Sequence, residues 1–380
     1  MEDFSFVRSP FAQWDVLPSF LVGELVFYAL AITALVHAAR SGRSHLLMFL
    51  GALLAGTAND LIFMALPLVD NFWHGQAMVM LTPRLPLYIP CVYISFMYIP
   101  AAAVRRLGWA PFPSAALTGL CSVLFYAPFD ITGAKLLWWT WHDTDLPVAS
   151  RILGAPASST LWVLTFSGAY ALLVHRALQG SFKGGDVGPV SNRRFAIGLL
   201  AVSGLATTLM VLQITPLQQL DGGAPGYIAL FCGLAVYAAV AALFAGPRRA
   251  PPASSHDRVL VGVVALYAVA LSVAIGLSSP RAHRSVGVHQ TVGECGVMAR
   301  DVTGLEREEF LCATGFDEPF ELAPAPAEGA AWYAVIGTED ERRPARCAAV
   351  GGVGFASTLL LATLFGVFRK RKPAQRTTMV

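Results

Sequence analysis

Long apolar runs, each close to the length that crosses a lipid bilayer, dominate the pattern of the chain. A transmembrane helix needs about 20 consecutive apolar residues, and the sequence repeats such runs from its first residues almost to its last. The runs cover residues 17–38, 46–68, 85–104, 113–134, 155–175, 195–215, 226–245, 259–279 and 348–368. This pattern predicts an all-α fold, a polytopic transmembrane helical bundle with about nine spans.

The composition supports a membrane protein and excludes one class of partner. Only 13% of the residues are charged and the mean hydropathy is +0.58, whereas soluble domains carry about 25% charged residues. The basic residues occur in short patches, so the chain offers no extended basic surface for nucleic acid. We expect membrane lipid as the partner and no cofactor. Glycine pairs such as Gly51 and Gly56 predict close helix contacts, within one chain or in a homo-oligomer.

Lysine and arginine are concentrated on one side of the predicted spans. That side holds Arg40, Arg43, Arg105, Arg106, Arg193, Arg194 and the basic tail. The short segments on the other side hold only Arg8, Arg84, Lys135 and Arg151. The positive-inside rule therefore predicts a cytosolic C-terminus and an N-terminus outside or in a lumen, an arrangement that an odd number of spans also requires.

The spans divide the chain into five parts. We expect an outer segment 1–16, an eight-span core 17–279, an outer or lumenal segment 280–347, a ninth span 348–368 and a cytosolic tail 369–380. Cys295 and Cys312 flank a polar stretch of the outer segment and could form a disulfide bond in an oxidising compartment. The pattern allows either the plasma membrane or an endomembrane.

Three acidic residues lie at one depth in the predicted membrane. Glu24, Asp60 and Asp130 belong to different spans, each roughly 10–13 Å below the outer surface at a rise of about 1.5 Å per residue. A charge in the bilayer core costs about 3 kcal/mol or more, so such residues are uncommon. They predict the floor of a polar pocket. The cytosolic loops show no comparable cluster. Residues 205–280 hold few polar features, so we expect residues 205–280 to form scaffold.

The stretch WWTWHDTD at residues 138–145 would cover that pocket from the outer side. If the fourth helix continues past Gly133, then Lys135, Trp138, Trp139, His142 and Asp145 share one face. The predicted catalytic residues are Glu24, Asp60, Asp130, His142, Asp143 and Asp145. The predicted substrate-binding residues are Asn59, His74, Lys135, Trp138, Trp139 and Trp141.

Structural explanations compete with these roles. The tryptophans could form an interfacial aromatic belt, and His74, His142, Asp143 and Asp145 could be solvated. Asp60 could make an interhelical hydrogen bond, Asp130 could pair with Lys135, and Glu24 could cap a neighbouring segment.

Four functions fit the pattern. The first is a membrane-embedded enzyme on an apolar lipid, because desolvation favours neutral carboxyl groups that can donate protons. The second is an ion- or proton-coupled transporter or channel. The cytosolic halves of the spans are nearly free of charge, which counts against an ion path through the whole membrane. The third is a metal-dependent lipid hydrolase using His74, His142 and Asp143 or Asp145. Without a close histidine pair the metal signal is weak, and we expect no metal. The fourth is a receptor acting through segment 280–347.

Several stretches resemble an uncharacterised eukaryotic family of multi-pass membrane proteins. They are DNFWHGQ, RLPLYI, PFDITGAKLLWWTWHDTD, RILGAP, SVGVHQTVGEC and LCATGFDEPF, in chain order. The resemblance implies a multi-pass fold and carries no activity. The family pattern has a histidine near the position of Asn59. The layout WTWHD…LGAP is also similar to the tryptophan-rich motif of membrane carotenoid hydratases, with Ala155 in place of the usual valine, which implies acid/base chemistry on a polyene or isoprenoid.

Overall fold

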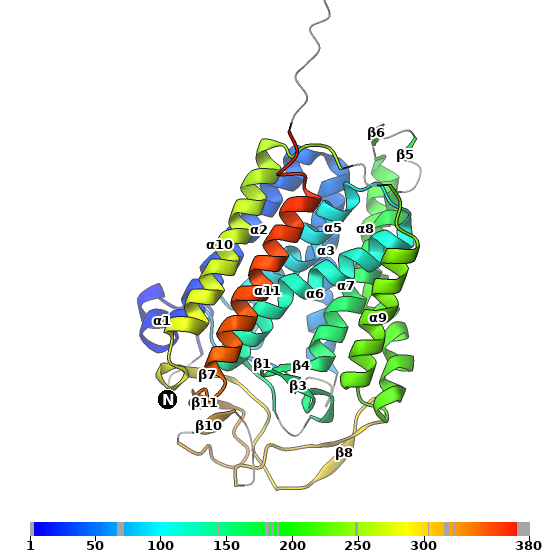
Figure 1. The fold of residues 1–380 in the computed structure, drawn as a ribbon. Coiled ribbons are helices and arrows are strands. Elements are labelled where there is room, and N and C mark those ends of the chain that lie inside the picture. Colours follow the sequence, from blue (N-terminus) through cyan, green and yellow to red (C-terminus); the bar gives the residue numbers. More distant parts are fainter. Residues whose placement is uncertain are drawn as a thin grey trace, which may run out of the picture.

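The computed structural model shows a bundle of long helices with a small β-structure at one end (Figure 1). It describes residues 4–66, 72–142, 145–178, 182–183, 186–187, 190–247, 250–302, 304–314, 319–322 and 324–370. The bundle helices are α2 (Pro18–Ser41), α3 (Arg43–Ala65), α4 (Tyr88–Tyr93), η1 (Ile94–Tyr98), α5 (Ile99–Arg105), α6 (Pro111–Lys135), α7 (Ala157–Leu178), α8 (Asn192–Gln218), α9 (Tyr227–Leu243), α10 (Ser255–Leu277) and α11 (Arg343–Leu364).

The predicted helical membrane architecture is confirmed at the level of helix length and composition. Within the described ranges, eight helices are long and apolar enough to cross a membrane, counting α4, η1 and α5 as one. The remaining predicted span corresponds to α9, which is apolar but has only 17 residues. Large apolar side chains such as Leu212, Phe231 and Leu243 are exposed on the outside of the bundle, as expected of helices that contact lipid.

Local sequence explains where several helices begin. Proline is the first residue of α2 and α6 and the second residue of α11, within the first turn, where a missing backbone N–H costs nothing. The side chain of Ser254 accepts a hydrogen bond from the Asp257 N–H, and Asp257 accepts one from the Ser254 N–H in return. This reciprocal capping box fixes the start of α10.

The third span is a central helix made of α4, η1 and α5. Pro90 and Pro100 each remove a backbone donor, and residues Ile94–Tyr98 between them form a π-helix. Tyr88, Tyr93 and Tyr98 recur along this helix at intervals of five residues, and all three are buried. π-Helical turns occur frequently at functional sites, and each of these tyrosines contacts a histidine or an aspartate on another element.

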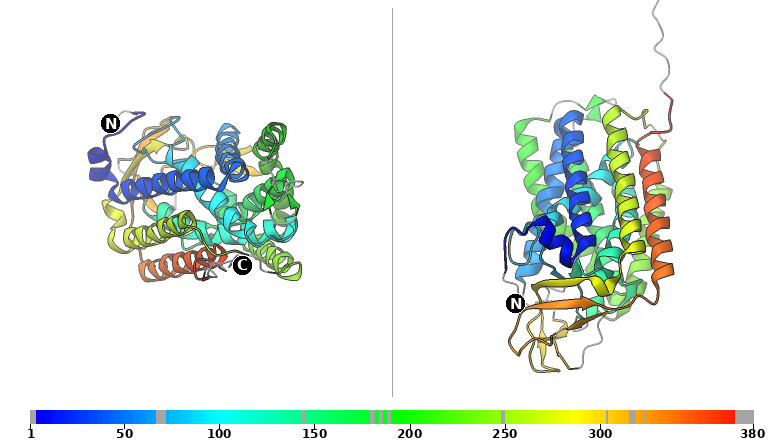
Figure 2. Two further views of the ribbon diagram at one scale, coloured as in Figure 1. Left: turned by 90° about the horizontal axis from the view of Figure 1, so that it is seen from above. Right: turned by 90° about the vertical axis from the view of Figure 1, so that its left-hand side faces the viewer.

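The β-structure forms what we call the strand end of the bundle. Its sheet has the order β10 (Phe320–Leu322), β11 (Trp332–Gly337) and β7 (Arg284–Val288), all antiparallel. A hairpin of β8 (Met298–Arg300) and β9 (Glu306–Glu308) and the short helix α1 (Pro10–Val16) lie at the same end (Figures 1 and 2). The predicted disulfide bond between Cys295 and Cys312 is present.

The opposite end, which we call the tail end, holds the last residues of α11 and the hairpin of β5 (Phe182–Lys183) and β6 (Asp186–Val187) (Figure 1). The short pairs β3 (Arg151–Ile152) with β4 (Ala155–Pro156), and β1 (Trp73–His74) with β2 (Trp139–Thr140), lie at the strand end. The N-terminal helix and the described residues of segment 280–342 thus share one end, and the chain leaves α11 at the other.

The helix α6 does not continue through the tryptophan-rich stretch, so the condition under which residues 135–145 would share one helical face is not met. The helix ends at Lys135, Leu137 takes a left-handed conformation with φ 57°, and the chain then enters β2. Lys135 Nζ donates hydrogen bonds to the carbonyl groups of Thr338 and Glu339, each at 3.1 Å. The alternative pairing of Lys135 with Asp130 is therefore absent, and Lys135 attaches segment 280–342 to the bundle.

Candidate functional site

A cavity of about 550 Å³ opens into the bundle beneath the strand end. Helices α3, α4, η1, α6, α7 and α8 contribute to its wall, and the loops of the strand end contribute to its roof. The wall is mainly aromatic. We call this space the aromatic cavity, after Phe63, Phe72, Phe96, Tyr126, Phe129, Trp139, Trp141 and Trp162.

Asp60 is the carboxyl group in the wall of the aromatic cavity. It lies on α3, is 4% exposed, and accepts a hydrogen bond from the hydroxyl group of Tyr93 on the central helix. The adjacent Asn59 also lines the cavity and accepts a hydrogen bond from Thr207 Oγ1 on α8 at 3.0 Å. The two polar residues thus connect α3 to two neighbouring helices, and Asp60 combines this contact with access to the cavity.

The other two acidic residues of the predicted pocket floor lie behind the wall. Glu24 accepts hydrogen bonds from the Met78 N–H at 3.0 Å and from the Tyr28 hydroxyl group at 3.2 Å. It therefore anchors the segment around Met78 to α2. Asp130 is 1% exposed, and neither of its oxygens makes a hydrogen bond of good geometry. Ser159, which lines the cavity, is its polar neighbour. The three acidic residues were predicted at one depth in the membrane, but they do not line one pocket.

The predicted tryptophan cluster divides between the cavity and the core. Trp139 and Trp141 line the aromatic cavity, together with His74. Trp138 is fully buried elsewhere: its Nε1 donates to Ser19 Oγ at 3.1 Å and its ring packs on Gly23, where a side chain would not fit. Within the described residues, His74 Nε2, Trp139 Nε1 and Trp141 Nε1 are buried without a hydrogen-bond partner. Buried polar atoms without a partner are uncommon.

A buried ion-pair cluster forms part of the cavity roof. Arg307, on β9, lines the cavity and contacts the carboxylate of Asp145, while its Nε lies 2.7 Å from Asp301 Oδ2. Predicted site residue His142 is fully buried beside Trp73, with ring centroids 4.5 Å apart, and Asp143 lies outside the described residues. Sequence reasoning missed Arg307, because its position in a predicted outer segment gave no sign that it would reach the cavity.

Buried histidines at the strand end should make the protein sensitive to acid. Burial, aided by Arg84, lowers the pKa of His74 to about 3, and burial also lowers the pKa values of His283 and His289 below the usual 6.5. Below pH 6.5 the unfolded chain binds protons that the folded chain excludes, so stability falls as the pH falls.

We therefore expect the unfolding temperature to be lower at pH 5 than at pH 7.5. His74 alone accounts for about 2 kcal/mol of lost stability at pH 5 if its folded pKa is near 3. Calorimetry of the detergent-purified protein over this range measures the effect. His289→Gln should flatten the profile, and a wild-type profile that does not change between pH 7.5 and 5 would contradict the prediction.

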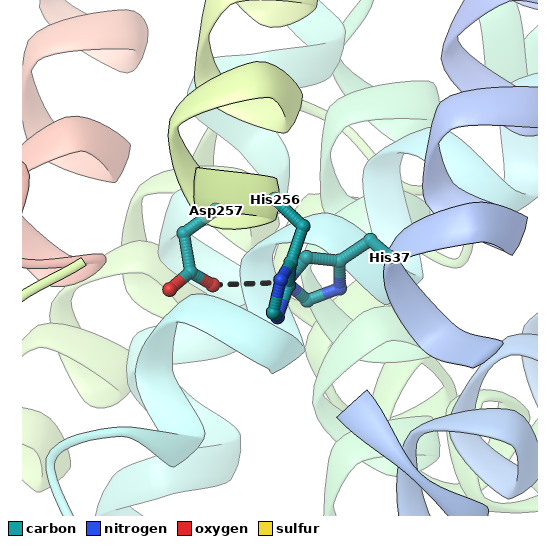
Figure 3. Close-up of side chains that lie close together, drawn as sticks. All are labelled: His37, His256 and Asp257. Carbon is teal, nitrogen blue, oxygen red and sulfur yellow. Dashed lines mark hydrogen bonds and ion pairs between the residues drawn. The ribbon is translucent and has the colours of Figure 1, made fainter. Parts of the chain in front are cut away.

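A second polar cluster lies at the tail end. His37 on α2 meets His256 and Asp257 from the first turn of α10 (Figure 3), and one ligand atom of each lies within 4.8 Å of the others. Across the ranges that the structure describes, no other group of His, Cys, Asp or Glu meets this criterion. The predicted hydrolase centre does not meet this criterion with its described residues His74, His142 and Asp145.

Two expectations from the sequence are corrected by this cluster and by α8. Residues 205–280 are not plain scaffold, because Met210, Ile214 and Gln218 line the aromatic cavity and α10 supplies His256 and Asp257. The tail end also has a polar cluster of its own. The adjacent His256 and Asp257 are a local signal for this cluster, but their partner His37 is more than 200 residues away.

Comparison with known proteins identifies the family without an activity. No curated protein and no solved structure matches the chain. The family model described as "Domain of unknown function (DUF7802)" matches residues 5–365, which is nearly the whole chain. This agrees with the expected membership of an uncharacterised family. The chain therefore belongs to the DUF7802 family.

Proposed function

We propose that this protein is a membrane-embedded enzyme that performs acid/base chemistry on an apolar lipid or isoprenoid bound in the aromatic cavity. The observation that carries the proposal is the hydrogen-bonded pair of Asp60 and Tyr93 in the wall of a largely aromatic cavity of about 550 Å³. Apolar pockets of a few hundred Å³ with a few placed polar groups are typical of small-molecule sites.

The chemistry that fits these groups is addition of water to a carbon–carbon double bond. Tyr93 donates to Asp60 Oδ1, which leaves Oδ2 to carry the transferable proton. Protonated Asp60 gives this proton to one alkene carbon, the double bond supplies the electron pair, and water attacks the carbocation. The proton released by water returns to the Asp60 carboxylate, so the net change is one water added. Aromatic rings such as Trp139 and Trp162 stabilise the cationic intermediate.

The same proposal includes an orientation. The helix termini at the tail end carry Arg40, Arg43, Arg105, Arg106, Arg193 and Arg194. The positive-inside rule therefore assigns this end to the cytosol. The strand end is then outside or in a lumen, where the bond between Cys295 and Cys312 is stable. With α9 counted as a span the total is nine, and the aromatic cavity takes its substrate from the outer or lumenal leaflet.

Native mass spectrometry of the detergent-purified protein tests whether the cavity holds a lipid. We expect a bound lipid of defined mass on the wild type and its loss from Ile214→Trp, because Ile214 of α8 lines the cavity and a larger ring there fills the space. Leu212→Trp is the matched control, since Leu212 lies on the same helix, is 64% exposed and does not line the cavity. Equal lipid occupancy in both variants would remove the support for a cavity site.

One observation favours a second candidate, an ion- or proton-coupled transporter. Titratable residues occur at both ends of the bundle, Asp60 at the strand end and the cluster around Asp257 at the tail end. Charged and titratable residues within spans often mark ion paths. Proton or ion flux into proteoliposomes, lost in both Asp60→Asn and Asp257→Asn, would favour transport over catalysis.

A further inference from the structure

We propose that His37, His256 and Asp257 bind a divalent first-row transition metal ion at the tail end of the bundle. This site is separate from the aromatic cavity and does not depend on the function proposed for it. Two imidazole groups and one carboxylate form a donor set suited to Zn²⁺ or Fe²⁺. Sequence reasoning expected no metal, because no histidine pair at short spacing is present.

The distances between donor atoms suit one small ion. His37 Nε2 and Asp257 Oδ1 lie 3.0 Å apart, and a ligand atom of His256 lies within 4.8 Å of both. A tetrahedral zinc ion with bonds of about 2.0–2.1 Å needs its ligand atoms ~3.3 Å apart. Modest side-chain rotation of His256 therefore completes three ligands, and the fourth position stays open.

Neighbouring hydrogen bonds leave the correct atom of each buried ligand facing the site. His37 Nδ1 lies 2.6 Å from the Tyr98 hydroxyl oxygen, which also lies 3.3 Å from His45 Nδ1. If Nδ1–H of His37 donates to Tyr98 and Tyr98 donates to His45, the lone pair of His37 Nε2 points toward Asp257. Such support of a histidine ligand through its other nitrogen is the rule in metal sites.

The carboxylate of Asp257 is held in the same way. Its Oδ2 accepts from Arg106 Nη1 at 3.1 Å and from the N–H and hydroxyl groups of Ser254, each at 2.7 Å. Arg106 also donates to the carbonyl groups of Pro251 and Pro252. These contacts occupy Oδ2. They leave Oδ1, which faces His37 Nε2, as the metal-binding atom.

The third ligand gives an ion access from the aqueous side. His256 is partly exposed at the start of α10, whereas His37 and Asp257 are buried. An ion arriving from the tail end can thus bind His256 before it reaches the two buried ligands. A water molecule on the fourth position would become more acidic.

Metal analysis of the full-length protein tests this site directly. The protein is purified in detergent without a histidine tag, stripped with EDTA, and titrated with ZnCl₂ by calorimetry, with metal content measured by mass spectrometry. We expect one zinc ion per chain. His37→Gln and His256→Gln should lose it, and Tyr98→Phe should weaken affinity about 10- to 100-fold. His175→Gln, a partly buried histidine of α7 outside the cluster, is the matched control.

The variants keep the test decisive even if one of them fails to fold. His256→Gln alters a partly exposed side chain and leaves the Ser254–Asp257 cap intact, so its folding can be checked by gel filtration. Zinc should raise the unfolding temperature of the wild type and of His175→Gln but not of His256→Gln. No zinc uptake by the wild type, or equal uptake by wild type and His256→Gln, would overturn the proposal and leave a metal-free His37–Asp257 hydrogen bond.

Discussion

The substitution Asp60→Asn is expected to lower the rate of lipid conversion by about 10²- to 10⁴-fold, the usual contribution of a general acid. An amide keeps the size of the carboxyl group and can still accept a hydrogen bond from Tyr93, but it cannot transfer a proton at neutral pH. The measurement is the lipid profile of cells that express each form, followed by turnover of the lipid that co-purifies with the wild type.

Two controls separate catalysis from folding in that experiment. Asp15→Asn makes the same chemical change at an exposed position of α1 and should leave turnover at the wild-type level. The lipid found by native mass spectrometry should remain bound to Asp60→Asn, because the aromatic wall is unchanged. Wild-type turnover by Asp60→Asn would exclude Asp60 as the acid, and flux lost without any change in lipids would favour the transporter.

Arg307→Met is expected to destabilise the protein by about 3–5 kcal/mol, the range measured when one partner of a buried ion pair is removed. Arg307 contacts both Asp145 and Asp301, and all three side chains are nearly fully buried. Loss of the guanidinium group leaves the two carboxylates without this cation in the roof of the aromatic cavity. Chemical denaturation in mixed micelles measures the change in the free energy of unfolding.

The same hairpin supplies the matched control for this substitution. Arg300 pairs with Glu306 at 2.9 Å, but the side chains of this pair are 72% and 59% exposed. Exposed pairs contribute about 1 kcal/mol or less, so Arg300→Met should change stability little. If both substitutions lower the free energy of unfolding equally, the effect of Arg307→Met would come from a general disturbance of the hairpin. It would then not come from loss of a buried charge.

The helices were predictable because length and apolarity are local properties. Each predicted span overlaps a helix of the structure, including the irregular third span that contains Pro90 and Pro100. The disulfide bond between Cys295 and Cys312 followed from their separation within one polar segment. The number of spans that cross the membrane and their orientation stay predictions.

The site was only partly predictable because it depends on where side chains turn and on contacts between distant segments. Asp60, His74, Trp139 and Trp141 were predicted to lie near one end, and all four line the cavity; their roles stay predictions. The left-handed residue Leu137 sends the adjacent Trp138 into the core instead, and no periodicity reveals such a turn.

The second cluster shows the same limit over a longer range. His37 and Asp257 are 220 positions apart, so only the packing of α2 against α10 brings them together. A single sequence offers no signal for that contact. The adjacent His256 and Asp257 resemble an ordinary polar helix start, which is a role that Asp257 also has through its cap on Ser254.

The π-helix Ile94–Tyr98 fixes how the residues before it are oriented relative to the residues after it, and so links the two ends of the molecule. Tyr93 precedes it and holds Asp60, and Tyr98 ends it and holds His37. A π-helical turn holds one residue more than an α-helical turn, so deleting one residue inside it would leave an ordinary α-helix whose two flanking segments stay almost in phase. Tyr93 and Tyr98 could then both keep their partners, so the extra residue is an insertion that the helix absorbs within one turn without displacing either end of the bundle.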